Sequence, residues 1–273
     1  MIFQILNVGH GFCGYFVADN GNRVLIDCGR SDALWPSLYL PRQGCRSIEH
    51  FVVTNYDEDH IADLPELCRA NLIHAGTVFY RNRSISPAEL RRLKLESGPI
   101  SPAMENLLQL HEEFVHPVAD PPPLSDARPM WFWNSYRDVD DTNNLSLVLF
   151  LHSHDLHIVL PGDLEEKGWA KLLERPSFRD ELRTVNVFVA SHHGRESGYH
   201  EPVFDHCQPE LVVVSDGPMA FLTQEMAATY GRHASGVSIR GETRKVLTTR
   251  SDGTITFAQA AGYPLVCKTG DWS

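Results

Sequence analysis

The sequence has little of several features that would place it in a special class of protein. Its net charge is −11, so it lacks the basic excess of a dedicated nucleic-acid binder. A site that holds metal can still attract phosphates locally, so this charge weakens a nuclease assignment without excluding one. No apolar run approaches the length needed to cross a bilayer. The composition, 42% hydrophobic and 22% charged, indicates a globular protein.

The cysteines also lack a pattern. None of the six belongs to a C-x-x-C pair, and most lie in apolar segments, which favours free thiols in a reducing compartment over disulfides. Residues 1–8 have neither a basic start nor a continuous apolar run, so we expect no signal peptide. We therefore expect a cytoplasmic protein that makes no contact with a membrane.

Apolar runs bounded by turn residues predict two β-rich halves, each with helices after its strands. We expect two sheets packed together with helices outside, an α/β fold. We also expect a hairpin at the end of the chain, with residues 244–249 and 254–258 joined by a turn at Ser251-Asp252-Gly253.

Between the two halves, residues 81–130 differ in character. Ser86-Pro87-Ala88-Glu89 has the form of a capping box with proline at the first helical position, and residues 102–114 have an apolar helical face. These apolar residues need a surface to pack against, so a disordered linker is disfavoured. We interpret the segment as a helical insertion within one domain of residues 1–273, which covers a cleft or contacts a protein partner.

One turn has most of the chemistry. Phe51-Val52-Val53 predicts a short buried strand, and a helical pattern begins at Ile61. The turn between them holds four side chains able to bind metal: Asn55, Asp57, Asp59 and His60. Clustered carboxylates repel one another unless a cation neutralises them. By itself the turn is equally consistent with an acidic helix N-terminus that favours the helix dipole.

Two later loops change that balance. Asp163 follows the apolar strand 156–162, and the pair His192-His193 follows the strand 185–190. Alone, Asp163 is a candidate helix cap and the histidines a packed or solvated pair. Loops at one edge of a sheet can converge in space, and Asp59, His60, Asp163 and His192 would then supply two oxygen and two nitrogen ligands. Such a set suits Zn²⁺ or Mn²⁺ with access for water.

The order of these motifs resembles the metallo-β-lactamase superfamily, and within it the hydrolase domain of ComEC-type competence proteins. The family patterns L-I-D-x-G, T-H-x-D-x-D-H-I-G-G-L, G-D-L and S-H-H-G correspond to stretches that begin at Leu25, Thr54, Gly162 and Ser191. The opening V-G-Q-G-D corresponds to Val8-Gly9-His10-Gly11-Phe12, and a late Y-G-x-H-like stretch ends at His233. The resemblance covers nearly the whole chain except residues 81–130.

The resemblance implies a four-layer αββα sandwich and one or two metal ions, with Asp163 as bridging ligand if there are two and Asp57 at the first ion. It further implies hydrolysis by a metal-activated water, whose proton Asp59 can accept, and a role for His193 or His233 in stabilising charge or protonating the leaving group. Both histidines are equally consistent with hydrogen bonding to a ligand. Asn55 stands where the family has its first histidine, so the first-ion site is weakened.

Three functions follow as hypotheses. The first is a metal-dependent phosphodiesterase or nuclease, for which a nucleic acid is one candidate substrate. The second is a degenerate metal-binding module that acts with a protein partner through residues 81–130. The third keeps the hydrolase and changes the substrate to a small ester, lactone or phosphorylated metabolite.

Overall fold

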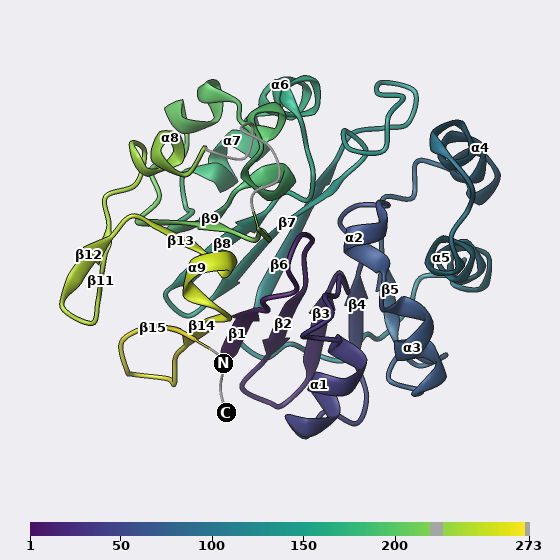
Figure 1. Cartoon of the computed structure of the whole chain (residues 1–273), viewed down its shortest axis with the longest axis horizontal. Coiled ribbons are helices and arrows are strands. Elements are labelled where there is room, and N and C mark those ends of the chain that lie inside the picture. The colour runs from purple at the N-terminus through teal and green to yellow at the C-terminus, as the bar shows by residue number, and fades with distance from the viewer. Residues whose placement is uncertain (219–225, 271–273) are drawn as a thin grey trace.

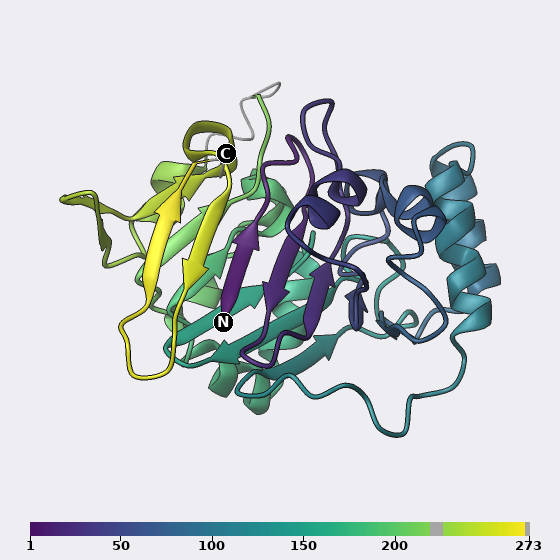
Figure 2. The ribbon, with the colours of Figure 1, turned by 90° about the horizontal axis from the view of Figure 1, so that it is seen from below.

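A computed structural model describes residues 1–218 and 226–270 and contains two stacked sheets with helices on both outer faces (Figure 1). The seven-stranded sheet has the order β15-β14-β1-β2-β3-β4-β5 and the six-stranded sheet the order β13-β10-β9-β8-β7-β6. Figure 2 shows the seven-stranded sheet, with its purple and yellow strands, in front of the other sheet, and the helices of the first half at one side. The predicted α/β sandwich of four layers is confirmed by this arrangement.

The elements of the first half are β1 (Ile2–Ile5), β2 (Gly14–Val17), β3 (Arg23–Ile26), α1 (Pro36–Arg42), β4 (His50–Val52), α2 (Glu58–Ile61), α3 (Leu64–Arg69), β5 (Val78–Tyr80), α4 (Pro87–Ser97) and α5 (Pro102–Glu113). The second half has β6 (Arg128–Trp133), β7 (Leu147–Ser153), β8 (Leu156–Leu160), α6 (Glu166–Leu173), α7 (Pro176–Leu182), β9 (Val187–Val189), β10 (Leu211–Val214), α8 (Ala227–Gly231), β11 (Val237–Ile239), β12 (Glu242–Arg244), β13 (Val246–Thr248), α9 (Thr249–Asp252), β14 (Ile255–Ala258) and β15 (Val266–Thr269). Short 3₁₀ turns cover Ser191–Gly194, Glu196–Gly198 and Glu201–Asp205.

The alternation of side chains along each strand explains the layers. In β3, Val24 and Ile26 face the other sheet, whereas Leu25 packs with the helices of the first half. In β7, Leu149 joins the core between the sheets, whereas Phe150 packs with Trp169 of α6 on the outer face. Successive side chains of a strand point to opposite faces, so strands that are apolar on both sides are buried between two layers.

The predicted terminal hairpin is wrong. β13 pairs in parallel with β10 in one sheet, whereas β14 pairs antiparallel with β1 in the other. The turn residues Ser251 and Asp252 belong to α9, which begins at Thr249 after the cap Thr248, whose hydroxyl accepts the Ser251 amide. A local turn signal cannot reveal that the two strands it separates belong to different sheets.

The predicted helices of the insertion are present. α4 begins with the predicted capping box between Ser86 and Glu89, and α5 begins after Ser101, whose hydroxyl accepts the amide of Met104. Leu107 and Leu108 of α5 are buried against the helices beside the first sheet, at the right of Figure 1. Within residues 1–218 and 226–270, no helix is long and apolar enough to cross a membrane.

Candidate metal centre

The turn after β4 is held by side chains that accept its backbone amides. The buried carboxylate of Asp27 accepts the amide of Thr54 at 2.7 Å and also the Thr54 hydroxyl. The side-chain oxygen of Asn55 accepts the amide of Asp57 at 2.7 Å. These bonds replace regular strand pairing, and they fix the position from which α2 presents Asp59 and His60.

Four ligand atoms converge from three loops. The group consists of Asp59, His60, Asp163 and His193, and one ligand atom from each lies within 4.8 Å of all the others. His60 Nε2 is 2.9 Å from Asp163 Oδ1, and His193 Nε2 is 3.2 Å from Asp59 Oδ2. The two Nε2 atoms are 3.3 Å apart. β4 ends in one sheet and β8 and β9 end in the other, and these strand ends meet at the same edge of the sandwich.

The second nitrogen of each histidine has its own partner. His60 Nδ1 is 2.7 Å from Asp27 Oδ2, and His193 Nδ1 is 3.0 Å from the carbonyl oxygen of Ser215. A proton held on Nδ1 by an oxygen leaves the Nε2 lone pair free, which is the arrangement of metal-binding histidines. Asp27 was present in the sequence as the L-I-D-x-G motif, but its contact with His60 could not be inferred from it.

Charges inside the cluster shift its pKa values. Burial lowers the pKa of His60, but the adjacent carboxylates of Asp163 and Asp27 outweigh burial and raise it well above its ordinary value. Burial raises the pKa of Asp59, but the hydrogen bond and charge of His193 outweigh burial and lower it. Burial also raises the pKa of Asp163, but the charges of His60 and His193 outweigh burial and lower it to about 2, so Asp59 and Asp163 are ionised and attract positive charge into a buried space.

The structure brings His193 rather than His192 to the group of possible ligands. His192 points away from the cluster, with Nδ1 3.0 Å from Glu165 Oε1 and Nε2 3.3 Å from a guanidinium nitrogen of Arg195. His193 Nε2 is the fourth atom of the group that could hold an ion. Both residues have positive φ, 50° and 55°, so the chain turns sharply and sends the two rings in different directions.

Asn55 and Asp57 lie apart from the four-ligand group. The Asn55 amide nitrogen donates to Ser146 Oγ at 3.2 Å, and its oxygen is used by the turn. Asp57 Oδ1 is 2.5 Å from the ammonium of Lys94, which comes from α4, and 3.2 Å from the hydroxyl of Thr142. A lysine therefore neutralises the carboxylate that the sequence assigned to a first ion.

His233 also lies outside the cluster. Its ring stacks on Phe204 with centroids 4.0 Å apart, and its Nε2 is 2.8 Å from the hydroxyl of Tyr199. These partners belong to the outer helical layer beside the second sheet. The only sequence signal for His233 was that a titratable residue stands in a family-like stretch. In the structure this residue packs in the outer helical layer instead of lying at the cluster.

Two residues at the cluster escaped the sequence analysis as functional groups. The ring of His10 lies 4.6 Å from that of His193, and its Nε2 is 3.4 Å from Asp59 Oδ2. Arg195 donates towards His10 at 3.1 Å as well as towards His192. His10 lies in a glycine-rich turn, and Arg195 directly follows the S-H-H-G motif. No motif or spacing in the sequence identified either of them as a functional residue.

Comparisons with known proteins agree with this architecture. The sequence profile of the metallo-beta-lactamase superfamily matches residues 7–169. ComE operon protein 3 of Bacillus subtilis is 23% identical over 186 residues, which are 66% of this chain and 21% of that protein. The chain thus spans about a fifth of the curated relative that it matches.

A solved structure shows the same fold. The metallo-beta-lactamase fold protein YhfI from Bacillus subtilis superimposes with a TM-score of 0.51 at 11% identity, covering 93% of this chain and 99% of that one. The resemblance found in the sequence motifs is therefore confirmed. On the profile match over more than half of its length, this chain belongs to the metallo-beta-lactamase superfamily, a superfamily of metal-dependent hydrolases.

Proposed function

We propose that this chain is a metal-dependent phosphodiesterase with a single-ion centre formed by Asp59, His60, Asp163 and His193. The observation that supports it is the convergence of these four ligand atoms from three separate loops. When bound, a divalent ion acts as a Lewis acid and lowers the pKa of a water molecule towards neutrality. The hydrolase domain is taken as residues 1–273, with the helical insertion as part of it.

The donor set fits zinc. Two imidazole nitrogens and two carboxylate oxygens are common ligands of Zn²⁺ in four-coordinate sites. Bonds of about 2.0–2.1 Å at tetrahedral angles place ligand atoms roughly 3.3 Å apart. The contacts of His193 Nε2 with Asp59, His60 and Asp163 are 3.2, 3.3 and 3.5 Å. Mn²⁺ is the alternative that the carboxylates allow.

The residues that the sequence offered to a second ion beside this centre are engaged in other contacts, and the other group of possible ligands among the described residues, Asp19, Asp126 and His154, shares no residue with it. The Asn55 amide is engaged on both sides, and a neutral amide is a weaker ligand than an imidazole. The Lys94 ammonium 2.5 Å from Asp57 supplies the positive charge that an ion would otherwise bring. We therefore propose one ion, with Lys94 as a fixed cation beside it.

The groups around the centre suit an anionic substrate. The chain has a net charge of −11, yet Arg195 and Lys94 both lie beside residues of the ligand turns. Arginine and lysine bind phosphate oxygens through charge-assisted hydrogen bonds, which favours a phosphodiester over a neutral lactone. A phosphodiester of a nucleic acid is one candidate within this class.

The residues of the chain divide the remaining work. Asp59 is the carboxylate that solvent can reach, with 27% of its side chain exposed against 3% for Asp163. We assign Asp59 the second role of accepting the proton of the attacking water. His10, at the exposed side of His193, is placed to donate a hydrogen bond to a substrate oxygen together with Arg195.

The test measures metal content and cleavage on the same protein. The purified chain is assayed by elemental analysis and then with bis(p-nitrophenyl) phosphate, single-stranded DNA, RNA, a thioester and a lactone, each with Zn²⁺ or Mn²⁺. We expect one ion per chain and cleavage of a diester that is lost in His60→Ala and Asp163→Asn and kept in His233→Ala. Cleavage that survives both ligand substitutions would refute the proposal. One bound ion without turnover of any substrate would favour the interaction module instead.

A further inference from the structure

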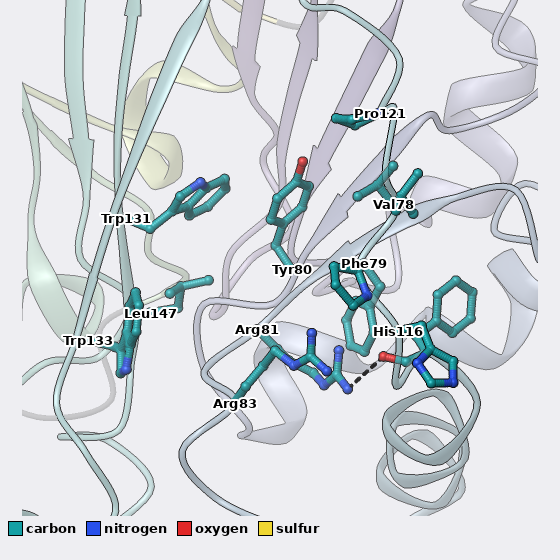
Figure 3. A pocket seen from close by; sticks show the side chains of 13 residues that line it. Val78, Phe79, Tyr80, Arg81, Arg83, His116, Pro121, Trp131, Trp133 and Leu147 are labelled. Carbon is teal, nitrogen blue, oxygen red and sulfur yellow. Dashed lines mark hydrogen bonds between the residues drawn. The ribbon is translucent and has the colours of Figure 1, made fainter.

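A second cavity lies between the edges of the two sheets. It has a volume of about 260 Å³ and shares no lining residue with the space beside His60 and Asp163. β5 is the edge strand of one sheet and β6 the edge strand of the other. The chain after α5 closes the cavity with His116, Pro117, Val118 and Pro121. Figure 3 shows the side chains that line it.

Arg81 is the unusual residue of this cavity. Only 8% of it is exposed, its guanidinium lies 4.7 Å from the centroid of the Phe79 ring, and no carboxylate is among the groups that shift its pKa. Its Nη2 donates to the carbonyl oxygens of His111 and Phe114, at 3.2 and 3.0 Å. Its Nε and Nη1 have no hydrogen-bond partner. A buried guanidinium with unused donors is costly, and an anion would remove that cost.

A second guanidinium lies beside the first. Arg83 is exposed and donates to the carbonyl oxygen of Val115, and its charge lowers the pKa of Arg81 after the larger effect of burial, to about 10. In Figure 3 the two side chains lie together at one end of the cavity. None of the residues lining the cavity is acidic. Like charges held together without a counter-ion attract an anion to that end.

The rest of the cavity is apolar and aromatic. Tyr80 of β5 and Trp131 of β6 stack with ring centroids 4.7 Å apart and an angle of 15°, so they join the two sheet edges. Trp133 is 41% exposed, although it is a large apolar side chain. Figure 3 shows Trp131 and Trp133 on one side and Val78 and Phe79 on the other. The volume is close to the lower end of the roughly 300–1,000 Å³ of small-molecule sites.

We propose that this cavity binds a small organic anion, with its carboxylate or phosphate group at Arg81 and Arg83 and an apolar or aromatic body between β5 and β6. The arginines provide charge-assisted hydrogen bonds, and the aromatic walls provide apolar contact area. The site is independent of the metal centre, since neither its residues nor its chemistry involves the metal ligands.

The test compares three ligands that share one body. The metal-free protein is titrated with 3-phenylpropionate, phenyl phosphate and the neutral 3-phenylpropanol in a calorimeter. The difference in affinity between the anions and the alcohol measures how much the anionic group contributes to binding. We expect at least one anion to bind about tenfold more tightly than the alcohol, the worth of one charge-assisted bond. The two anions distinguish a carboxylate ligand from a phosphate ligand. Equal affinities for all three compounds would overturn the proposal.

Substitutions locate the binding. Arg83→Gln is at an exposed position and preserves the fold, and we expect it to weaken the anion about tenfold without changing the alcohol. Trp131→Ala should weaken both kinds of ligand, and Arg81→Met should abolish the preference for the anion. His60→Ala and the exposed Arg69→Gln, neither of which lines the cavity, are the controls, and both should bind as the parent chain does. Unchanged binding in Arg83→Gln and Trp131→Ala, or loss of binding in His60→Ala, would overturn the assignment to this cavity.

Discussion

Replacing His193 with alanine removes one of the four ligand atoms of the proposed centre and leaves the adjacent imidazole of His192 in place. The chain therefore contains its own matched control, since His192→Ala removes the same chemical group one residue away. If proximity in sequence decided the ligand, the two variants would lose metal equally. The structure predicts that only one of them does.

The expected magnitude follows from the number of ligands. Structural zinc sites with four ligands bind with about 10–16 kcal/mol, so an equal share per ligand is about 2.5–4 kcal/mol. His193→Ala should therefore weaken zinc binding about 10²- to 10³-fold. Asp27→Asn retains all four candidate ligands and changes the group that contacts His60 Nδ1 and the Thr54 hydroxyl, so we expect it to weaken zinc binding about 10- to 100-fold. His192→Ala should change the zinc affinity less than either.

The assay is competition for Zn²⁺ between each variant and a chromogenic chelator, with circular dichroism to show that each variant is folded. We expect the dissociation constant for Zn²⁺ to be largest in His193→Ala, intermediate in Asp27→Asn and close to that of the parent in His192→Ala. A His192→Ala variant that loses zinc while His193→Ala keeps it would refute the proposed ligand set. The measurement needs no substrate, so it is independent of whether the proposed reaction is correct.

Three further predictions test other parts of the structure. Asn55→His alone should leave the zinc stoichiometry at one, because Lys94 still pairs with Asp57. Asn55→His combined with Lys94→Met should raise the stoichiometry measured by elemental analysis. A second ion in the single variant would contradict the role given to Lys94. Burial, and then the charge of Arg81, lower the pKa of His111 from 6.5 to about 3. As the pH falls, His111 is therefore protonated in the unfolded chain before it is protonated in the folded chain. The free energy of unfolding should fall by about 1.4 kcal/mol per pH unit as the pH drops from 6.5 towards 4. Urea titrations of His111→Leu should show a smaller loss over this range, and the exposed His116→Leu should show the parent's loss. Phe16→Ala, in the core between the sheets, should lower the unfolding free energy by about 3–5 kcal/mol, against less than about 0.5 kcal/mol for Leu38→Ala, which is 58% exposed.

Much of the fold was predictable because it depends on local patterns. Strands that are buried on both faces read as apolar runs, and turn residues separate them, so most of the sheet elements could be placed from the sequence. The helices α4 and α5 could be placed from their capping serines and apolar faces. The assignment of β13 and β14 to different sheets could not, because it depends on pairing with strands far away in the chain.

The candidate site divides in the same way. The meeting of Asp59, His60 and Asp163 could be expected from the sequence because each lies in a segment that leads away from the end of a strand, β4 or β8, and strand ends at one edge meet. The choice between His192 and His193 was not, because it depends on two consecutive residues with positive φ, a conformation that the letters His-His do not favour. His233 and Arg195 show the limit of prediction from motifs. His233 belongs to a motif but lies outside the cluster, whereas Arg195 contacts residues at the cluster but belongs to no motif.

Asn55 and Lys94 are better understood together than separately. Asn55 alone looks like the loss of a ligand, and it leaves Asp57 as a carboxylate near other carboxylates without an imidazole beside it. Lys94 lies 37 positions after Asp57, in the helical insertion, and its ammonium contacts the Asp57 carboxylate directly. The helix that the sequence suggested as a cover or partner surface thus contributes a cation to the turn that presents Asp59 and His60. If the cation serves the reaction, Lys94→Met should lower diester turnover while zinc affinity at the four-ligand group is unchanged. If it serves only the fold of the turn, both should fall together.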